Sequence, residues 1–443
     1  MTIKIRNSAT GIKTQFVPID DNRVTMYSCG PTVYSYAHIG NMRAAVSSDI
    51  VYRVLLIKYG EDSVVYSRNI TDIDDKIITA ADNEGVSIFE ISEKYRKIYE
   101  EDVLSLNCLN PNKSPKATDY VQQMIEMISL LIEKGHAYES NGHVFFDVES
   151  NPNDLMFSKH VKTEDRISRI DPSVFRMKRS KEDFVLWKPS KGTDVGWNSP
   201  FGYGRMGWHI ECSSMIKSTL GETIDIHCGG IDLKFPHHEN EIAQSQCAHD
   251  KPLSNFWIHN EFVNIDGGKI AKSSGNSSSA RDVIEEWGGE VVRLGLISSH
   301  YKKPIEWSDD ILSKSKSHLD RWYDKKLKFP NIKIVGNDIS DFKEALFDDF
   351  NVPKAISVVH KYEKMSLFGK MIQSLNLIGL LLSDASVWFK GDVDEQKIQD
   401  MVDLRVKMKL AKDWDAADKI REDLSKLGVS VEDKGAETIW KVL

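Results

Sequence analysis

The chain has 443 residues, a length that exceeds one compact domain and predicts about two to four. Its net charge of −8 argues against a generally basic protein that coats nucleic acid. The sequence contains no run of about 18 apolar residues, the length needed to span a membrane, so we expect no membrane span. The five cysteines are odd in number and widely spaced, and the first residues lack the apolar core of a signal peptide. We therefore expect reduced thiols and a cytoplasmic location.

The first strongly patterned segment predicts a βαβ unit. An apolar, β-branched run at 24–27 is followed by helical periodicity over 42–55 and by a second strand at 63–66. Between the first strand and the helix stand Cys29 and the turn His38-Ile39-Gly40-Asn41. Because free N–H groups at a helix N-terminus collect phosphate, this turn is a candidate phosphate site. A loop with a surface histidine is the alternative.

Strands and helices keep alternating to about residue 110 and again from residue 208, which predicts a parallel sheet covered on both faces. The further expected elements are a helix at 120–134, a hairpin at 138–148, a strand at 222–227, a helix at 236–248 and a strand at 256–263. Residues 1–22 predict one short strand. The tail predicts one charged helix and a short strand at 428–431.

These patterns predict an α/β protein with a Rossmann-like parallel-sheet domain, a helical region after it and a small mixed C-terminal segment. The expected divisions are 1–114 with 206–300 for the sheet domain, 115–205 for an inserted subdomain, 301–338 for a linker, 339–398 for a helical bundle and 399–443 for the C-terminal segment. We find no internal repeat.

Cysteine, histidine and acidic residues that are far apart in the sequence form a candidate metal site. In the helix at 236–248, His237 and Glu241 are four residues apart and share a face, while His238 and Glu241 are three apart and could also share one. Two thiols, an imidazole and a carboxylate suit tetrahedral zinc. The candidate ligands are Cys29, Cys212, His237 and Glu241, with His238, His227 and Cys228 as rivals. Buried free thiols beside a polar helix start are the alternative.

Two further segments could bind a nucleotide. Lys269 and Lys272 stand three apart in a glycine-rich loop, and such paired cations can stabilise charge on a triphosphate. A solvated lysine loop is the alternative. Gly230 and Asp232 follow the strand at 222–227, where glycines and an acid suit a ribose contact, although a plain turn would explain them equally well.

Taken together, five separated segments in this order resemble the cysteinyl-tRNA synthetases of class I over nearly the whole chain. The matching segments are Cys29 to Tyr34 with His38 to Asn41, Asn69 to Lys76, Gly207 to Ser213, Phe235 to Glu241, and Lys269 to Ser273. The stretch 416–421 also resembles the C-terminal segment of this family.

The resemblance implies an enzyme that activates L-cysteine with ATP to cysteinyl-adenylate and transfers it to the 3′ end of tRNA(Cys). It implies one zinc ion per chain, held by Cys29, Cys212, His237 and Glu241, which recognises the thiolate of the substrate. It also implies Mg²⁺ with ATP, a monomer without a membrane partner, a stem-contacting linker and an anticodon-binding C-terminal region. Trp440, Arg421 and Lys419 are candidates for contacts with tRNA.

Carried over by position, the resemblance gives each site residue a role. The implied residues are His38, Gly40 and Asn41 for ATP, Gly230 and Asp232 for the nucleoside, Lys269 and Lys272 for the pyrophosphate, and Cys29, Thr71 and Trp208 for the amino acid. Three positions depart from the family pattern. Ile270 and Ala271 replace methionine and serine, and we expect the lost hydroxyl to have a modest effect on activity. Met206 replaces proline, and we expect a looser entrance to the amino-acid pocket.

Two other functions compete with this one. A paralogous ligase would join the activated cysteine to an amino sugar, but it has no need of the long region after Ile305, and we expect it to lack Glu241 as a fourth ligand. A catalytically silent RNA- or zinc-binding protein would have no reason to retain His38, Lys269 and Lys272.

Overall fold

The computed structural model describes residues 1–153, 155–159, 176–191, 194–265, 268–269, 279–390, 395–426, 429–434 and 437–442. Among the helices within them, none combines the length and the apolar character needed to cross a bilayer.

A four-stranded parallel sheet lies at the centre of the fold, as the sequence predicts. Its strands are β3 (Val24–Ser28), β4 (Val64–Arg68), β9 (Ile224–Gly230) and β10 (Ser254–Asn260), in the order β10-β9-β3-β4. The chain leaves β3 in one direction to reach β4, and leaves β9 in the other direction to reach β10. The order therefore reverses between β3 and β9. In open α/β sheets, ligands bind in the crevice beyond the carboxyl ends of the strands at such a reversal.

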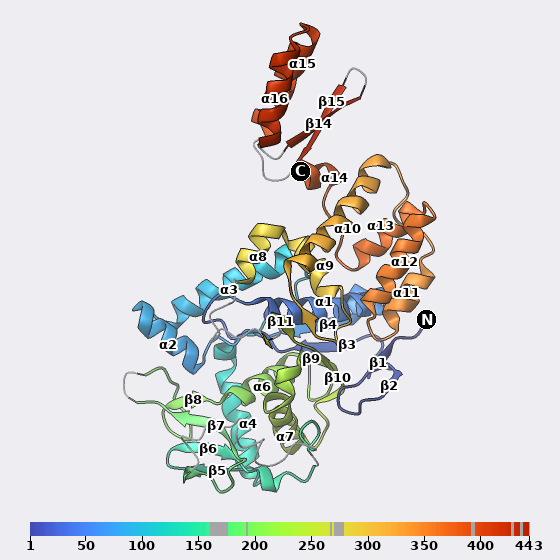
Figure 1. Ribbon diagram of the computed structural model, residues 1–443. Helices are drawn as coiled ribbons and strands as arrows, with labels where there is room; N and C mark the ends of the chain where they lie inside the picture. The colour runs from blue at the N-terminus through green and yellow to red at the C-terminus, as the bar shows by residue number, and fades with distance from the viewer. Residues whose placement is uncertain are drawn as a thin grey trace. The chain divides into compact units, whose positions relative to one another are not determined.

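Helix α1 (Ile39–Tyr59) connects β3 to β4 and packs against β3, β4 and β9 (Figure 1). The predicted helix is confirmed, and it extends by one turn at its N-terminus to include the glycine turn. Its buried residues lie on all sides, because the sheet covers one flank and α9 (Gly289–Ile297) another. These residues include a carboxylate, Asp49, and two arginines, Arg43 and Arg53.

Asp49 connects three separate parts of the chain. Its Oδ2 accepts hydrogen bonds from Arg53 Nε at 2.8 Å and from Arg293 of α9, and its Oδ1 accepts the backbone N–H of Leu109 at 2.7 Å. All three side chains of this ion cluster are buried. Removing one member of a buried ion pair leaves an uncompensated charge away from water.

We therefore expect Asp49→Ala to lower the free energy of unfolding by about 3–5 kcal/mol. The control is Lys13→Ala, which breaks an ion pair with Asp348 (Nζ–Oδ1 2.6 Å) whose side chains are about one-third exposed. Exposed pairs contribute less than about 1 kcal/mol. Urea unfolding of the two variants measures the difference, and equal losses would contradict the role given to Asp49.

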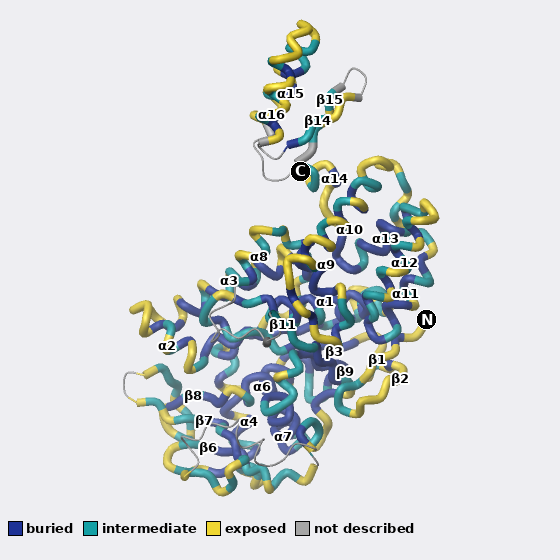
Figure 2. Tube along the Cα trace, viewed as in Figure 1, coloured by how far each residue is buried: buried dark blue, intermediate teal, exposed yellow. Residues whose placement is uncertain are grey.

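The remaining elements up to residue 306, apart from the inserted sheet described next, lie around this sheet. They are β1 (Lys4–Arg6), β2 (Lys13–Gln15), α2 (Asp75–Glu84), α3 (Ile88–Ser105), α4 (Val121–Glu133), α6 (Trp208–Thr219), α7 (His237–His249), β11 (Val263–Ile265), β12 (Gly268–Lys269), α8 (Ala280–Trp287) and β13 (Ile305–Glu306). Helices α4, α6 and α7 pack against one another. Figure 2 shows α7 as buried along most of its length.

The stretch predicted as an insertion contains a second, antiparallel sheet of order β5-β6-β7-β8. Its strands are β5 (Ala137–Ser140), β6 (His143–Phe146), β7 (Phe184–Pro189) and β8 (Gly204–Met206). The predicted hairpin is confirmed as β5-β6, with Asn141 and Gly142 at positive φ in its turn. Met206, one of the three departures from the family pattern, is buried in β8 and pairs with Trp187.

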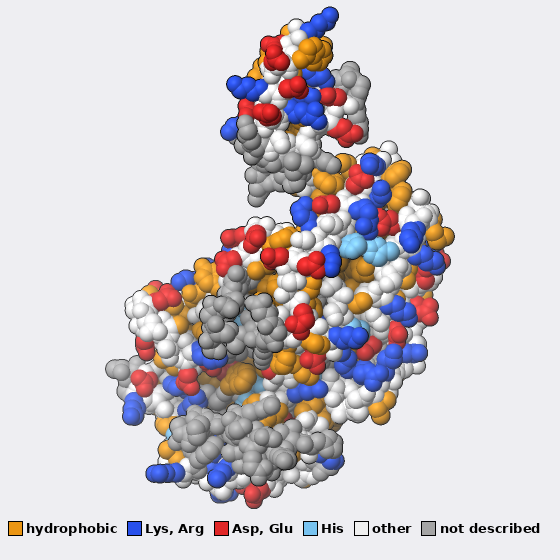
Figure 3. Space-filling model, viewed as in Figure 1, with side chains coloured by type: hydrophobic (Ala, Val, Ile, Leu, Met, Phe, Trp, Pro, Cys, Tyr) orange, Lys and Arg blue, Asp and Glu red, His pale blue; other side chains and the backbone are white. Residues whose placement is uncertain are grey.

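The elements after residue 306 are mostly helical. They are α10 (Asp309–Lys328), α11 (Ser340–Phe347), α12 (Val352–Lys364), α13 (Phe368–Leu377), α14 (Ala385–Lys390), α15 (Glu395–Leu410), α16 (Trp414–Lys426), β14 (Val429–Lys434) and β15 (Glu437–Val442). The chain divides into two compact units: residues 1–312 with 340–358, and residues 313–339 with 359–443. On the face drawn in Figure 3, acidic and basic side chains are interspersed over both units, in keeping with the net charge of −8.

Four features differ from the sequence prediction. The tail, where one strand was expected at 428–431, holds a hairpin of β14 and β15. The N-terminal region holds a hairpin, β1-β2, where one strand was expected. The strand expected at 256–263 is divided, because β10 ends at Asn260 in the parallel sheet and β11 starts a separate sheet with β12 and β13. The single charged helix of the tail is two helices, since Lys412 adopts a left-handed φ of 61° and the Asp413 side chain accepts the N–H of Ala416.

Candidate active site and metal centre

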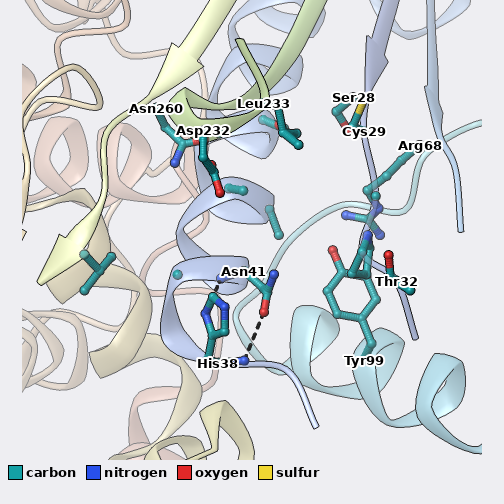
Figure 4. Close-up of a pocket in the computed structure, with 18 of the residues that line it drawn as sticks. Ser28, Cys29, Thr32, His38, Asn41, Arg68, Tyr99, Asp232, Leu233 and Asn260 are labelled. Atoms are coloured by element: carbon teal, nitrogen blue, oxygen red, sulfur yellow. Dashed lines mark hydrogen bonds between the residues drawn. The ribbon is translucent and has the colours of Figure 1, made fainter. Parts of the chain in front are cut away.

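A cavity of about 610 Å³ opens beyond the carboxyl ends of the parallel strands, at the reversal of strand order (Figure 4). On one side, Figure 4 shows His38 and Asn41 from the start of α1, with Asp232 and Asn260 facing them. On the other side lies Cys29 at the end of β3. The predicted residues that line this one cavity are Cys29, His38, Gly40, Asn41, Trp208, Gly230 and Asp232.

The turn at the start of α1 fixes the orientation of His38. The backbone N–H of Asn41 donates to His38 Nδ1 at 3.2 Å, and the backbone N–H of His38 donates to Asn41 Oδ1 at 3.1 Å, forming a capping box. Because Nδ1 is the acceptor, the proton of a neutral imidazole lies on Nε2, which becomes the donor. A Cβ at Gly40 would stand 2.8 Å from His38 Cε1, so only glycine leaves room for the ring.

Asn69 connects the loop after β3 to Thr71. Its Oδ1 accepts the backbone N–H of Gly30 at 2.8 Å, and its Nδ2 lies 3.4 Å from Thr71 Oγ1. Thr71 Oγ1 in turn lies 3.4 Å from Glu211 Oε2. Thr71 is buried behind the wall of the cavity and is not one of its lining residues among those described. A Cβ on Gly30 would lie 1.7 Å from the carbonyl oxygen of Asn69, so this close approach requires glycine.

The four predicted zinc ligands come from three places in the fold: Cys29 from the loop after β3, Cys212 from α6, and both His237 and Glu241 from α7. Their donor atoms on Cys29, Cys212, His237 and Glu241 all lie within 4.8 Å of one another, the two sulfurs 3.7 Å apart and His237 Nε2 2.8 Å from Glu241 Oε1. Two thiols, an imidazole and a carboxylate are a donor set that fits tetrahedral zinc.

The electrostatics of this cluster also suit a dication. The hydrogen bond with Cys29 lowers the pKa of the Cys212 thiol to about 6, whereas burial raises the pKa of Cys29 well above its ordinary value. Burial opposes ionisation of Glu241, yet His237 and His227 hold its pKa well below the usual range. Although burial opposes it, Glu241 raises the pKa of His237 to about 10, so a protonated imidazole offsets the carboxylate here, and a divalent ion would take the place of that positive charge.

A second set of ligands overlaps the first. Cys29, His227, His238 and Glu241 also have donor atoms within 4.8 Å of one another, so both rival histidines lie within reach of the same site. His227 Nε2 lies 2.8 Å from Glu241 Oε2, and His238 Nε2 lies 3.4 Å from Cys29 Sγ. The third rival, Cys228, belongs to neither set within the described chain, and burial alone raises the pKa of its thiol.

Further histidines and tryptophans surround both sets. His209 Nδ1 lies 2.9 Å from His237 Nδ1, and His259 Nε2 lies 2.8 Å from His238 Nδ1. Burial holds the pKa of His209 and of His259 well below the ordinary value, so both are neutral. Such partners on the second ring nitrogen orient a metal-binding histidine. Trp208 stacks on His237, with the ring centroids 4.2 Å apart.

Some functional positions were not predicted. Arg68, Tyr99 and Asn260 line the cavity, and His209 and His259 contact candidate ligands. Arg68 is the last residue of β4 and Asn260 is the last residue of β10. Because ligands bind beyond the carboxyl ends of parallel strands, this position at a strand end could have marked both residues as candidates. Of the lysine loop, only the backbone of Lys269 is described, in β12 opposite Asn264. Lys272, Ile270 and Ala271 lie outside the described residues.

The fold and sequence were compared with known proteins. Residues 15–317 match the model of the family described as tRNA synthetases class I (C) catalytic domain. Two solved structures share the fold at low identity. The Mycobacterium tuberculosis methionyl-tRNA synthetase with methionyl-adenylate has a TM-score of 0.58 and 14% identity, covering 81% of this chain and 89% of that one. A LeuRS–tRNA–LeuAMS complex from Agrobacterium radiobacter K84 has a TM-score of 0.58 and 11% identity, covering 82% and 83%.

The fold and the family match define the catalytic domain of a class I tRNA synthetase. Relatives match at much higher identity. The cysteine–tRNA ligase of Caulobacter sp. (strain K31) is 43% identical over 461 residues, and that of Caulobacter vibrioides (strain NA1000 / CB15N) is 44% identical over 465 residues. Each match covers 100% of both proteins. The chain therefore belongs to the cysteine–tRNA ligase family.

Proposed function

We propose that the protein is a cysteine–tRNA ligase, which activates L-cysteine with ATP and transfers it to the 3′ end of tRNA(Cys) in the cytoplasm. The observation that carries this proposal is the composition of one cavity. It has the His38–Asn41 turn on one side and Cys29, which belongs to a cluster fit for zinc, on the other. The five free cysteines agree with a reducing compartment.

The residues of the nucleotide side would bind ATP, accompanied by Mg²⁺. His38 Nε2, with Asn41 and the N-terminus of α1, would donate to the phosphates, and Asp232 would accept from the ribose hydroxyls. A Cβ at Gly230 would lie 2.5 Å from Asp232 Oδ1, so glycine lets this carboxylate stand at the edge of the cavity. Lys269 and Lys272 would neutralise the pyrophosphate as it leaves.

The metal side would select the amino acid. We place one zinc ion per chain with Cys29, Cys212, His237 and Glu241 rather than with the overlapping set, because Trp208 stacks on His237 and lines the cavity together with Cys29. Two thiolates also favour zinc over harder ions. When bound, zinc would offer a soft ligand position for the thiol of cysteine, which the hydroxyl of serine matches poorly.

The chemistry then needs mostly positioning. The carboxylate of cysteine attacks the α-phosphorus of ATP and pyrophosphate leaves, after which a ribose hydroxyl of the terminal adenosine of the tRNA attacks the activated carbonyl. Thr71 and Trp208 would orient the amino acid, and Asn69 would hold both Thr71 and the loop that carries Cys29. The protein would act as a monomer.

Cysteine-dependent exchange of pyrophosphate into ATP, followed by charging of tRNA(Cys), tests the proposal. We expect both activities. Exchange without charging would instead support the amino-sugar ligase, a function disfavoured by the full-length match to relatives, which includes the residues after 306. Absence of exchange would support a silent binding protein and contradict the proposal.

A further inference from the structure

Two cations that line the cavity are used by no step above. Arg68 lies over the ring of Tyr99 at 5.6 Å, and Lys76 lies over the ring of Tyr34 at 5.4 Å. All four side chains line the cavity, and we call them the basic wall. They come from the end of β4, from α3, from the first turn of α2 and from the loop after β3. Their convergence is therefore a product of tertiary structure.

Arg68 and Tyr99 of the basic wall lie across the cavity from the nucleotide side. Figure 4 shows the guanidinium of Arg68 beside Tyr99 and Thr32, on the side of Cys29, while His38, Asn41 and Asp232 lie across the cavity. The side chains assigned to ATP, which are His38, Asn41 and Asp232, thus lie on the opposite side of the cavity. An anion at the basic wall would belong to another substrate.

Arg68 differs from the other buried arginines of the same unit. Arg43 donates to the carbonyl oxygens of Leu296 and Lys303, and Arg53 and Arg293 both donate to Asp49. Arg68 is 6% exposed, yet within the described residues its guanidinium makes no hydrogen bond and no ion pair, and it lies over the ring of Tyr99. Lys76 likewise has no carboxylate partner among them. A buried, unneutralised guanidinium beside a cavity is a site for an oxyanion.

The combination of cations and aromatic rings indicates what that anion is. Proteins bind single-stranded nucleic acid by placing cations on backbone phosphates and aromatic rings against bases. Of the three substrates, only the 3′ terminus of tRNA offers both groups on a flexible strand. The carboxylate of cysteine must instead lie near the α-phosphorus of ATP on the side of His38.

We propose that Arg68 and Lys76 hold phosphodiester oxygens of the tRNA 3′ terminus during the transfer step, with Tyr99 orienting Arg68 and Tyr34 facing the terminal bases. This inference rests on the proposed function. In the transfer step, the ribose hydroxyl oxygen forms an ester bond to the cysteinyl carbonyl carbon. The bond from this carbon to the phosphate oxygen breaks, and AMP leaves with the bonding electrons and takes up the hydroxyl proton. The basic wall would supply positioning alone.

Single-turnover transfer tests the inference. Cysteinyl-adenylate is formed on the full-length enzyme, tRNA(Cys) is added, and the transfer rate is compared with the rate of pyrophosphate exchange. We expect Arg68→Gln and Lys76→Met each to slow transfer by about 10²-fold, the usual cost of a misplaced reactant, and to affect exchange far less. Lys76 is exposed, so its variant avoids the folding risk of the buried Arg68. Tyr99→Ala, which removes the ring that orients Arg68, should resemble Arg68→Gln.

Salt dependence supplies a readout that a purely structural role would leave unchanged. Loss of one phosphate contact should reduce the slope of log affinity for tRNA(Cys) against log salt concentration by about 0.7–1. The matched control is Lys94→Ala, which removes a cation 4.9 Å from the ring of Tyr95 outside the cavity and should change neither rate nor slope.

The outcomes separate the two proposals. Normal transfer by both Arg68→Gln and Lys76→Met, in an enzyme whose wild type exchanges and charges, overturns the basic wall alone. An equal fall in exchange and transfer assigns the wall to cysteine or ATP and also overturns it. A wild type without cysteine-dependent exchange overturns the proposed function, and the basic wall with it.

Discussion

Replacing Cys212 with serine is expected to weaken zinc binding by more than about 100-fold, since even outer-shell partners of a metal contribute about 10–100-fold. The hydroxyl of serine is not ionised near neutral pH, so the site would lose the thiolate that the hydrogen bond with Cys29 favours. Zinc content by elemental analysis, measured after dialysis against a chelator, should fall from about one per chain to near zero. Pyrophosphate exchange with cysteine should fall with it.

The chain offers a matched control for this variant. Cys228 is also a buried thiol, 2% exposed against 1% for Cys212, and it belongs to neither ligand set. We expect Cys228→Ser to keep its zinc and its exchange activity. Equal zinc loss in the two variants would mean that any buried serine disturbs this region, and it would contradict a specific role for Cys212.

A second pair of variants separates the two overlapping ligand sets. His237→Ala should lose zinc as Cys212→Ser does, whereas His238→Ala should retain most of it, because His238 would act only as an outer neighbour of Cys29. The reverse order of zinc loss would place the ion with Cys29, His227, His238 and Glu241 instead.

Replacing His38 with alanine is expected to slow adenylate formation by about 10²–10³-fold, the usual cost of removing one oriented donor from developing charge. The substitution also removes the Nδ1 acceptor of the helix cap, which costs about 1 kcal/mol of stability. Pre-steady-state formation of cysteinyl-adenylate measures the first effect, and thermal unfolding measures the second.

His38→Asn distinguishes the two roles of this side chain. Asparagine is a favoured cap and should restore stability, but it cannot extend a donor to where imidazole Nε2 lies. We therefore expect His38→Asn to unfold like the wild type and to activate cysteine as slowly as His38→Ala. Recovery of the activation rate together with stability would show that His38 serves only as a cap.

The sequence could predict elements that depend on neighbouring residues. The strand β3, the helix α1 and the turn at Gly40 follow from local periodicity and from a cap that spans four residues. The division of the tail helix into two was missed for an equally local reason. A residue in the left-handed region, such as Lys412, has no reliable sequence signature when it is neither glycine nor asparagine.

Features that depend on tertiary structure were harder to predict. Helical spacing places both His237 and His238 within reach of Glu241, so sequence alone left two ligand choices, and the structure gathers both around Cys29. The pairing of Arg68 with Tyr99 had no sequence signal, since 31 positions separate them and only the packing of α3 near the end of β4 brings them together.

The central claim is that a zinc ion beside the nucleotide site selects cysteine through its sulfur. Zinc-edge X-ray absorption of the zinc-loaded protein, with and without cysteine, tests it most directly. We expect two sulfur neighbours, from Cys29 and Cys212, in the free protein, and three when cysteine is bound, with no change on adding serine. A sulfur count that stays at two with saturating cysteine would contradict the claim.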